Sequence, residues 1–266
     1  MSSSELEAAL AAARAASVVI RKAYRGNFSV EYKADASPVT EVDVAAEKVI
    51  KAELAARFPD YGFFGEETGK EHAEAENLWL VDPIDGTKSF VRGYPIFSVQ
   101  IALMRRGELV LGVSCAPCWN ENLGELIWAE KGQGAWRGLL DTPLAQFERL
   151  QVSKVAQPDK AILSTGNLNT LARAPQQWAA LGRLIPQLHR LRGYGDFVHY
   201  HYLAAGKIDA VVESDVNILD IAALTVIVRE AGGRFTDLNG GPVGLDTRTV
   251  LASNGLLHGA FAELAL

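Results

Sequence analysis

The sequence has little cysteine and no long apolar run. Its 266 residues hold two cysteines, Cys115 and Cys118, which form one C-x-x-C pair. A zinc site would need further ligands at suitable spacing, and a redox pair would be expected at the start of a helix, which the strand-like run before Pro117 does not favour. We interpret both residues as incidental thiols. No apolar stretch is long enough to cross a bilayer, so we expect no membrane partner.

The sequence also lacks an excess of positive charge. Its formal net charge is -6, which argues against a broad nucleic-acid surface, because such a surface requires a basic face. A small anionic substrate is not excluded, since bound metal ions can supply local positive charge. Residues 1–10 lack the basic start and the continuous apolar core of a signal peptide, and we expect a cytoplasmic protein.

Hydrophobic periodicity divides the chain into two kinds of pattern. Helical spacing predicts one helix over residues 6–24 and, after a loop over 26–38, a second helix from Thr40 to near Pro59. Strands are predicted next, and after residue 161 strands and helices alternate. The predicted strands cover 78–81, 96–104, 108–114, 126–129, 135–136, 161–164, 191–194 and 210–213, and the later helices cover 176–188, 197–205 and 221–231.

These patterns predict an α+β fold in a single domain over residues 1–266. An antiparallel-rich half would cover about residues 1–145, and an α/β half with a helix-covered sheet would cover about residues 146–266. The segment 139–149 is the best candidate for the seam between them. We expect the two halves to be layered on one another.

The strongest chemical signal is an apolar strand that runs directly into an acidic turn at residues 79–90. Asp82 and Asp85 are three residues apart across this turn, so their carboxylates can converge on one point. Convergent carboxylates repel unless one is protonated or cations lie between them, and oxygen ligands of this kind suit Mg²⁺. The carbonyl of Ile84 is placed to add another oxygen. The amides of Gly86 and Thr87 could form a small nest for phosphate, although an acidic turn that merely ends a strand remains the alternative.

Three further acids could join this site, and each has a simpler explanation. Glu66 can reach a metal cluster from a separate loop, or belong to a solvated acidic loop. Asp43 matches a capping box with Thr40, and could also orient the hydroxyl of Thr87, which would hold an attacking water. Asp220 is placed to cap a late helix or to bring a third backbone segment to the cations.

The order of these blocks resembles the inositol monophosphatase family. The resemblance rests on Gly65-Glu66-Glu67, the block from Asp82 to Phe90 and the block from Asp220 to Ala223, and it extends over nearly the whole chain. It implies a layered α-β-α-β-α sandwich of the inositol monophosphatase and fructose-bisphosphatase type. It also implies Mg²⁺-dependent hydrolysis of a small phosphate monoester, with two or three ions in each active site, and a homodimer.

The resemblance also implies a role for each matching residue. Glu66, Asp82 and the carbonyl of Ile84 would bind one metal ion, and Asp82, Asp85 and Asp220 a second. Thr87, with Asp43 behind it, would activate water, while Asp85, Gly86 and Thr87 contact the phosphate. The family usually has tryptophan before the last metal-binding aspartate, where this chain has Leu219, which bears on local packing more than on chemistry.

A second turn bears on the identity of the substrate. The run Gly195-Asp196-Phe197 resembles the histidinol-phosphatase branch of the family. A carboxylate there would attract the ammonium group of histidinol phosphate, and Glu213 would add a second acid near the leaving group. Asp196 could instead cap the helix that begins at Phe197. His199 and His201 point to different helix faces, which makes them a poor metal pair, and we interpret them as packing or surface residues.

We therefore predict a phosphoric monoester hydrolase that acts on histidinol phosphate. An inositol-1-monophosphatase or a broad sugar-phosphate phosphatase is the alternative within this class, and a nucleotide 3'-phosphatase is a weaker one. An alternative of another class is a non-catalytic regulatory protein on the same fold. The presence of every proposed metal ligand speaks against it.

Overall fold

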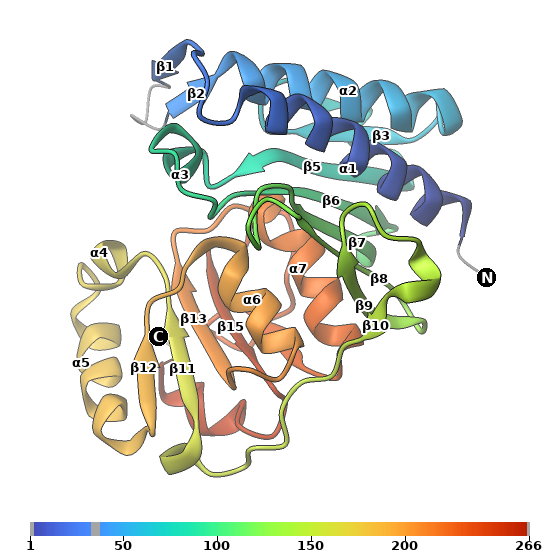
Figure 1. Ribbon diagram of the computed structural model, residues 1–266. Helices are drawn as coiled ribbons and strands as arrows, with labels where there is room; N and C mark the ends of the chain where they lie inside the picture. Colours follow the sequence, from blue (N-terminus) through green and yellow to red (C-terminus); the bar gives the residue numbers. More distant parts are fainter. Residues whose placement is uncertain (1–2, 33–37, 265–266) are drawn as a thin grey trace.

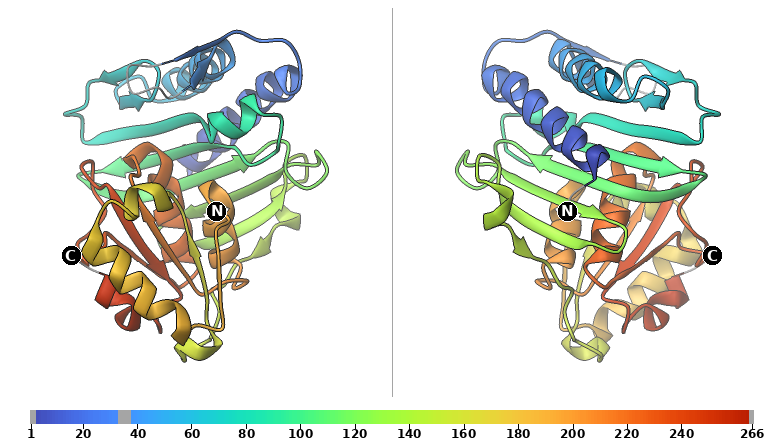
Figure 2. Two further views of the ribbon diagram at one scale, coloured as in Figure 1. Left: turned by 90° about the vertical axis from the view of Figure 1, so that its left-hand side faces the viewer. Right: turned by 90° about the vertical axis from the view of Figure 1, so that its right-hand side faces the viewer.

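The computed structural model describes residues 3–32 and 38–264 as two sheets alternating with three layers of helices (Figure 1). Helices α1 (Ser4–Ala23) and α2 (Glu41–Arg57) cover the outer face of the first sheet. Helices α6 (Asp196–Ala204) and α7 (Ile218–Glu230) lie between the sheets, and α5 (Pro175–Leu184) covers the second sheet from outside (Figures 1 and 2). This is the α-β-α-β-α sandwich expected from the sequence.

The first sheet has eight strands and is mostly antiparallel, with one parallel pair between β3 and β5. The sequence pattern did not predict that parallel pair. In spatial order the strands are β10 (Glu148–Arg149), β9 (Gly134–Leu139), β8 (Glu125–Glu130), β7 (Glu108–Ala116), β6 (Ser98–Arg105), β5 (Asn77–Asp85), β3 (Gly62–Gly65) and β4 (Gly69–Glu71).

The second sheet has five strands, joined by two parallel and two antiparallel pairs. In spatial order the strands are β12 (Arg190–Arg192), β11 (Ile162–Thr165), β13 (Ala210–Ser214), β15 (Thr249–Ser253) and β14 (Arg234–Thr236). From β11 to α7 strands alternate with helices along the chain, as the sequence predicted, whereas the last two strands, β14 and β15, were not predicted. The remaining short elements are α3 (Thr87–Val91), α4 (Leu168–Leu171) and the 3-10 turns Leu144–Gln146, Pro158–Lys160, Ile185–Gln187 and Gly259–Leu264.

Two predicted boundaries are wrong for identifiable reasons. The predicted helix over 176–188 ends at Leu184, because Pro186 has no backbone N–H to continue the hydrogen-bond ladder, and a 3-10 turn follows. The predicted loop over 26–38 contains β1 (Val30–Tyr32), which pairs with β2 (Pro38–Thr40). The rest of that loop, residues 33–37, lies outside the described residues.

Helix α7 forms the centre of the core that joins the two sheets. Helix α7 is apolar on nearly every face, since it is buried between both sheets. Gly112 of β7 lets it approach closely, because a Cβ atom there would lie 2.4 Å from the carbonyl oxygen of Ala223. Leu219, which stands where tryptophan was expected, is 2% exposed within this core. Among the described residues, no helix combines the length and apolar character needed to cross a membrane.

The two thiols lie in the core near α1. Cys115 is fully buried with its Sγ 3.2 Å from the hydroxyl of Ser17, and burial raises its pKa to about 12. Burial likewise raises the pKa of Cys118 to about 11. A thiol with such a pKa is hardly ionised at neutral pH, which favours the interpretation of both residues as packing groups.

One buried histidine, in the turn that follows β15 of the second sheet, predicts that the fold loses stability in acid. The ring nitrogens of His258 lie 3.1 Å from the Thr236 hydroxyl and 3.0 Å from the Ser253 hydroxyl, and burial lowers the pKa of His258 to about 4. The unfolded chain therefore binds a proton between pH 6.5 and 4 that the folded protein does not bind. This histidine should cost about 2 kcal/mol of stability between pH 7 and pH 5.

Replacing His258 with glutamine should make the loss of stability on acidification smaller than in the wild type. Urea unfolding of both proteins at pH 7 and pH 5 measures that difference, and the absolute stability of the variant does not enter it. Equal pH dependence in the two proteins would show that His258 is not the responsible group.

Candidate metal-dependent active site

Two of the predicted metal ligands lie at the end of β5. The pairing of β5 with β6 shifts register between Asp82 and Asp85, so the strand is irregular there. Asp82 turns back on its own backbone, and its Oδ1 accepts a hydrogen bond of 2.9 Å from the N–H of Ile84. Asp85 accepts a hydrogen bond of 3.4 Å from the hydroxyl of Ser98 on β6. These bonds hold both carboxylates at the carboxyl-terminal end of β5.

The third acid, Asp220, comes from the first turn of α7. The alternative in which Asp220 is the N-cap is wrong, because the helix begins earlier and Asn217 is its N-cap. Asp220 is the third helical residue and completes a capping box, since its Oδ2 accepts a hydrogen bond of 2.9 Å from the N–H of Asn217. The capping role and a ligand role are compatible, because the second oxygen is not used in the cap.

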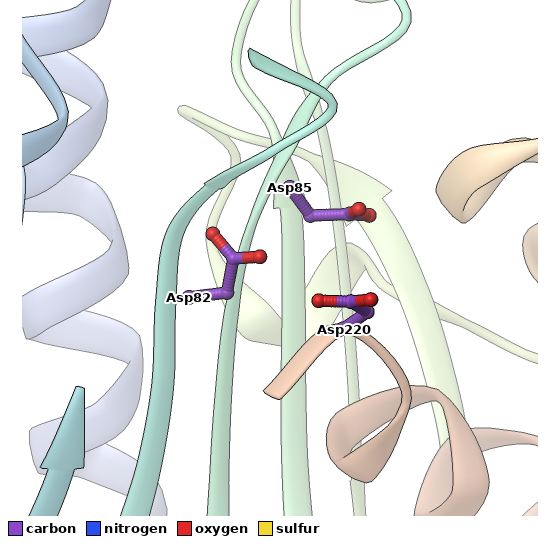
Figure 3. Close-up of side chains that lie close together, drawn as sticks. All are labelled: Asp82, Asp85 and Asp220. Carbon is purple, nitrogen blue, oxygen red and sulfur yellow. The ribbon is translucent and has the colours of Figure 1, made fainter. Parts of the chain in front are cut away.

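The three carboxylates meet at one point (Figure 3). Asp82, Asp85 and Asp220 each offer an oxygen, and these oxygens lie within 4.8 Å of one another. Burial and then the charges of neighbouring acids, Glu66 first, raise the pKa of Asp82 well above its usual range. Burial and the surrounding acids also raise the pKa of Asp85, and burial raises that of Asp220 to about 7. This concentration of negative charge is stable only when protons or cations neutralise it.

The chemistry of these donors fits a hard divalent cation. All are carboxylate oxygens, with no nitrogen or sulfur in the cluster, and Mg²⁺ and similar ions prefer such ligands. Glu66 reaches the same cluster from the loop after β3, because its charge and a side-chain hydrogen bond with Asp82 both raise the pKa of Asp82. The four acids that the sequence singled out as metal ligands therefore lie together, on three separate segments of the chain.

A hydroxyl and a fifth acid lie beside this cluster. The Thr87 Oγ1 lies 3.0 Å from Asp43 Oδ1 and 3.0 Å from the carbonyl oxygen of Ile84. The other oxygen of Asp43 accepts bonds from the N–H and the hydroxyl of Thr40, so Asp43 also forms the predicted capping box of α2. The hydroxyl of Thr87 can donate one hydrogen bond and accept two. When it donates to Asp43, its oxygen can still accept a hydrogen bond from a water molecule.

Gly86 makes the turn between Asp85 and Thr87 possible. Its φ is 92°, in the left-handed region that favours glycine, and a Cβ atom there would lie 2.7 Å from the carbonyl oxygen of Ile96. An alanine would therefore be both strained and in collision with the β5–β6 connection. The backbone at Gly86 and Thr87, where the sequence predicted a contact with the phosphate, is therefore held next to Asp85.

A buried glutamate that the sequence analysis missed supports the loop of Glu66. Glu47 of α2 is fully buried, and its two oxygens accept hydrogen bonds from the N–H groups of Glu67 and Thr68 at 2.8 and 2.7 Å. Gly65 leaves room for it, since a Cβ atom there would lie 2.5 Å from the Glu47 carboxyl carbon. Glu47 lies one helical turn after Asp43, and this spacing was the signal available in the sequence.

The two acids predicted to select the substrate also face one another. Asp196 and Glu213 line a cavity of about 50 Å³ with Asp85 and Asp220. Burial and then the charge of Glu213 raise the pKa of Asp196 to about 6, and this value already includes the smaller lowering effects of His199 and Lys88. Asp196 is the first residue of α6 and makes no side-chain cap, so the capping alternative is wrong. Its φ of 46° is strained for an aspartate.

His199 and His201 take different surroundings, as their spacing predicted, and both are buried rather than on the surface. His199 lies 3.1 Å from Oε2 of Glu213, and His201 lies 2.7 Å from Oε1 of Glu125 and 2.8 Å from the Ser114 hydroxyl. The two histidines, which the sequence presented as packing or surface residues, thus connect α6 to β13 of the second sheet and to β7 and β8 of the first.

Comparison with known proteins gives the class to which this arrangement belongs. The model of the inositol monophosphatase family matches residues 1–266. A histidinol-phosphatase of Mycobacterium tuberculosis is 39% identical over 97% of this chain and 96% of its own length. An inositol-1-monophosphatase of Caulobacter vibrioides is 34% identical over 91% and 96%. The solved structure of the extragenic suppressor protein suhB from Bartonella henselae superposes with a TM-score of 0.84, at 29% identity over 98% of both chains.

The chain belongs to the inositol monophosphatase family. It is a phosphoric monoester hydrolase, and its substrate is a small phosphate ester. The family is metal-dependent, and the acidic cluster of Asp82, Asp85 and Asp220 can hold a metal ion.

Proposed function

We propose that this protein is a Mg²⁺-dependent phosphatase that hydrolyses histidinol phosphate to histidinol and phosphate. The observation that carries the proposal is the pair of the half-buried Asp196 and the buried Glu213, two carboxylates that repel one another in the cavity beside the metal-binding acids. A cation placed between them would relieve that repulsion. Histidinol phosphate carries an ammonium group, whereas inositol phosphate offers only hydroxyls on the same side of the phosphate.

The metal-binding part of the proposal involves five residues. We propose that Glu66, Asp82, Asp85, Asp220 and the carbonyl of Ile84 hold two or three Mg²⁺ ions. When bound, Mg²⁺ supplies positive charge to the phosphate and the leaving oxygen and makes a bound water more acidic. The chemistry of the donors supports Mg²⁺, since every side-chain ligand in the set is a carboxylate.

Thr87 and Asp43 are proposed to prepare the attacking water. The hydroxyl of Thr87 would accept a hydrogen bond from the water and donate its own proton to Asp43, at the 3.0 Å that separates the two side chains. Burial raises the pKa of Asp43, which makes this carboxylate a better proton acceptor than a solvated one. Asp85 and the backbone at Gly86 and Thr87 would contact the phosphate.

The selectivity part involves three residues. We propose that Gly195 and Asp196 face the amine side of the substrate and that Glu213 accepts a hydrogen bond from its ammonium group. The histidinol-phosphatase of Mycobacterium tuberculosis, at 39% identity, supports this assignment. The inositol-1-monophosphatase of Caulobacter vibrioides, at 34% identity, keeps inositol 1-phosphate as the second candidate substrate. The homodimer also remains a prediction.

A direct comparison of substrates tests the proposal. We expect kcat/KM for histidinol phosphate to exceed that for inositol 1-phosphate by at least about tenfold, because a charge-assisted bond to a buried carboxylate contributes more than a neutral one. Release of inorganic phosphate with each ester in excess Mg²⁺ measures both constants. A preference for the inositol ester would refute the substrate and leave the class unchanged, whereas no release from any monoester would favour a regulatory protein.

A further inference from the structure

Glu213 is held from two sides by residues of α6. Its Oε2 lies 2.7 Å from the Tyr200 hydroxyl and 3.1 Å from Nε2 of His199. All three side chains are buried. No hydrogen bond to the other oxygen, Oε1, is found among residues 3–32 and 38–264. One oxygen of the carboxylate is therefore fixed by the protein, and the other is available for a ligand.

The hydrogen bonds behind His199 determine which of its nitrogens carries a proton. The hydroxyl of Ser164 accepts a bond of 3.3 Å from the N–H of Tyr194 and lies 3.3 Å from Nδ1 of His199. In the neutral ring the hydroxyl then donates to Nδ1, and Nε2–H donates to the Glu213 carboxylate. The chain of bonds runs from the backbone of Tyr194 to Oε2 in one direction, so each donor has an acceptor.

Gly166 lies next to the other oxygen of the Glu213 carboxylate. It directly follows β11, and a Cβ atom there would lie 2.0 Å from Oε1 of Glu213. The carboxylate therefore occupies the space that any other side chain at position 166 would need. His199 and Tyr200 thus hold Oε2, and the absence of a side chain at Gly166 leaves space for Oε1, so the two sides together orient the Glu213 carboxylate.

Helix α6 also carries Asp196, the second acid that is proposed to select the substrate. Asp196, His199 and Tyr200 are three and four residues apart, so they share one face of the helix. Tyr202 lies on another part of α6, where its ring contacts Tyr194 at a centroid distance of 5.3 Å. One face of α6 thus carries both the acid at the amine side of the cavity and the two donors that orient its partner.

We propose that His199 and Tyr200 are positioning residues that orient Glu213 and thereby set the preference for a substrate with a cationic group. This inference rests on the proposed function, in which Glu213 binds the ammonium group of the substrate. Tyr200 lines the same cavity as Glu213, but neither His199 nor Tyr200 belongs to the residues proposed to hold the metal ions, the phosphate or the attacking water. Their loss should change which ester is preferred and leave the hydrolysis step intact.

The test compares two esters in the Tyr200→Phe variant, which removes one hydroxyl and preserves the ring. We expect kcat/KM for histidinol phosphate to fall about tenfold, chiefly through a higher KM, because one donor to a buried charged acceptor is lost. For glycerol 2-phosphate, which has no cationic group, the change should stay below about threefold. Gly166→Ala, which displaces the same carboxylate from the opposite side, should give the same pattern, and Tyr202→Phe is the matched control with no effect on either ester.

Each outcome bears on the inference. Equal losses for both esters would indicate a merely structural role, and no loss for either would also overturn it. A wild type that does not prefer histidinol phosphate to glycerol 2-phosphate would refute the proposed function. In that case crystal structures of the wild type and Tyr200→Phe still decide the positioning role: a moved or doubled Glu213 carboxylate supports it, and an unmoved one overturns it.

Discussion

The Asp85→Asn variant should lose activity by at least about 10³-fold and yet melt at a higher temperature than the wild type when Mg²⁺ is absent. Asp85 lies within 4.8 Å of Asp82 and Asp220, and all three are shielded from water, so their charges repel strongly in the metal-free protein. Asparagine keeps the shape of the side chain and removes one charge. A gain of about 1–2 kcal/mol would raise the melting temperature by a few degrees in a protein of this size.

Thermal melts with EDTA and with excess Mg²⁺, together with phosphate release, measure both effects. The wild type should gain more stability from Mg²⁺ than the variant, because a ligand stabilises only the folded state that binds it. Asp159→Asn, at an exposed site in a 3-10 turn, is the matched control and should change neither quantity. An active variant, or one that melts at a lower temperature in EDTA, would contradict the assignment of Asp85 as a metal ligand.

The Thr87→Val variant should lower kcat by about 10²–10³-fold with little change in KM or in the Mg²⁺ requirement. Valine matches threonine in shape but cannot pass a proton to Asp43, whose Oδ1 lies 3.0 Å from the lost hydroxyl. The position is better suited to a test than Asp43 itself, because Asp43 also caps α2 through Thr40. Steady-state kinetics with the preferred ester measures the effect.

Thr87→Ser is the matched control for this test. It retains the hydroxyl and should keep most of the activity, while it loses the methyl group that valine keeps. If serine were as inactive as valine, the methyl group rather than the hydroxyl would be the important feature. A valine variant with nearly wild-type kcat would remove Thr87 from the proposed proton path.

The acidic cluster could be predicted from the sequence because two of its members, Asp82 and Asp85, belong to one short motif. Asp82 and Asp85 follow the predicted apolar strand over 78–81, so local chemistry alone indicated convergent carboxylates. The observed strand β5 continues to Asp85, with an irregular pairing between the two acids, and the turn at Gly86 marks its end. The link between Asp43 and Thr87 was also predicted, yet only coordinates could supply the 3.0 Å distance. The start of α7 was misjudged, since Asn217 and Asp220 are both good capping residues and sequence does not tell which comes first.

The supporting residues were not predicted, because their roles depend mainly on contacts between distant segments. Glu47 would be expected on a solvated helix face, and it is buried only because the loop after Glu66 folds over it. Tyr200 and His199 lie in an apolar helix where aromatic residues usually pack, and their hydrogen bonds exist because β13 presents Glu213 to them. The parallel pairing of β3 with β5 was missed for the same reason, since strand partners are set by tertiary packing.

The contact between Gly112 and Ala223 links the interior of the protein to the geometry of its metal site. Asp220 lies at the start of the helix that these two residues bring against the sheet, while Asp82 and Asp85 lie on that sheet. The distance between the Asp220 carboxylate and those of Asp82 and Asp85 therefore depends partly on the close contact of β7 with α7, which the missing side chain of Gly112 allows. A single methyl group added at Gly112 would push α7 away from the sheet and so move Asp220 relative to the other two acids. It would thereby affect catalysis from a position remote from the substrate and the cations.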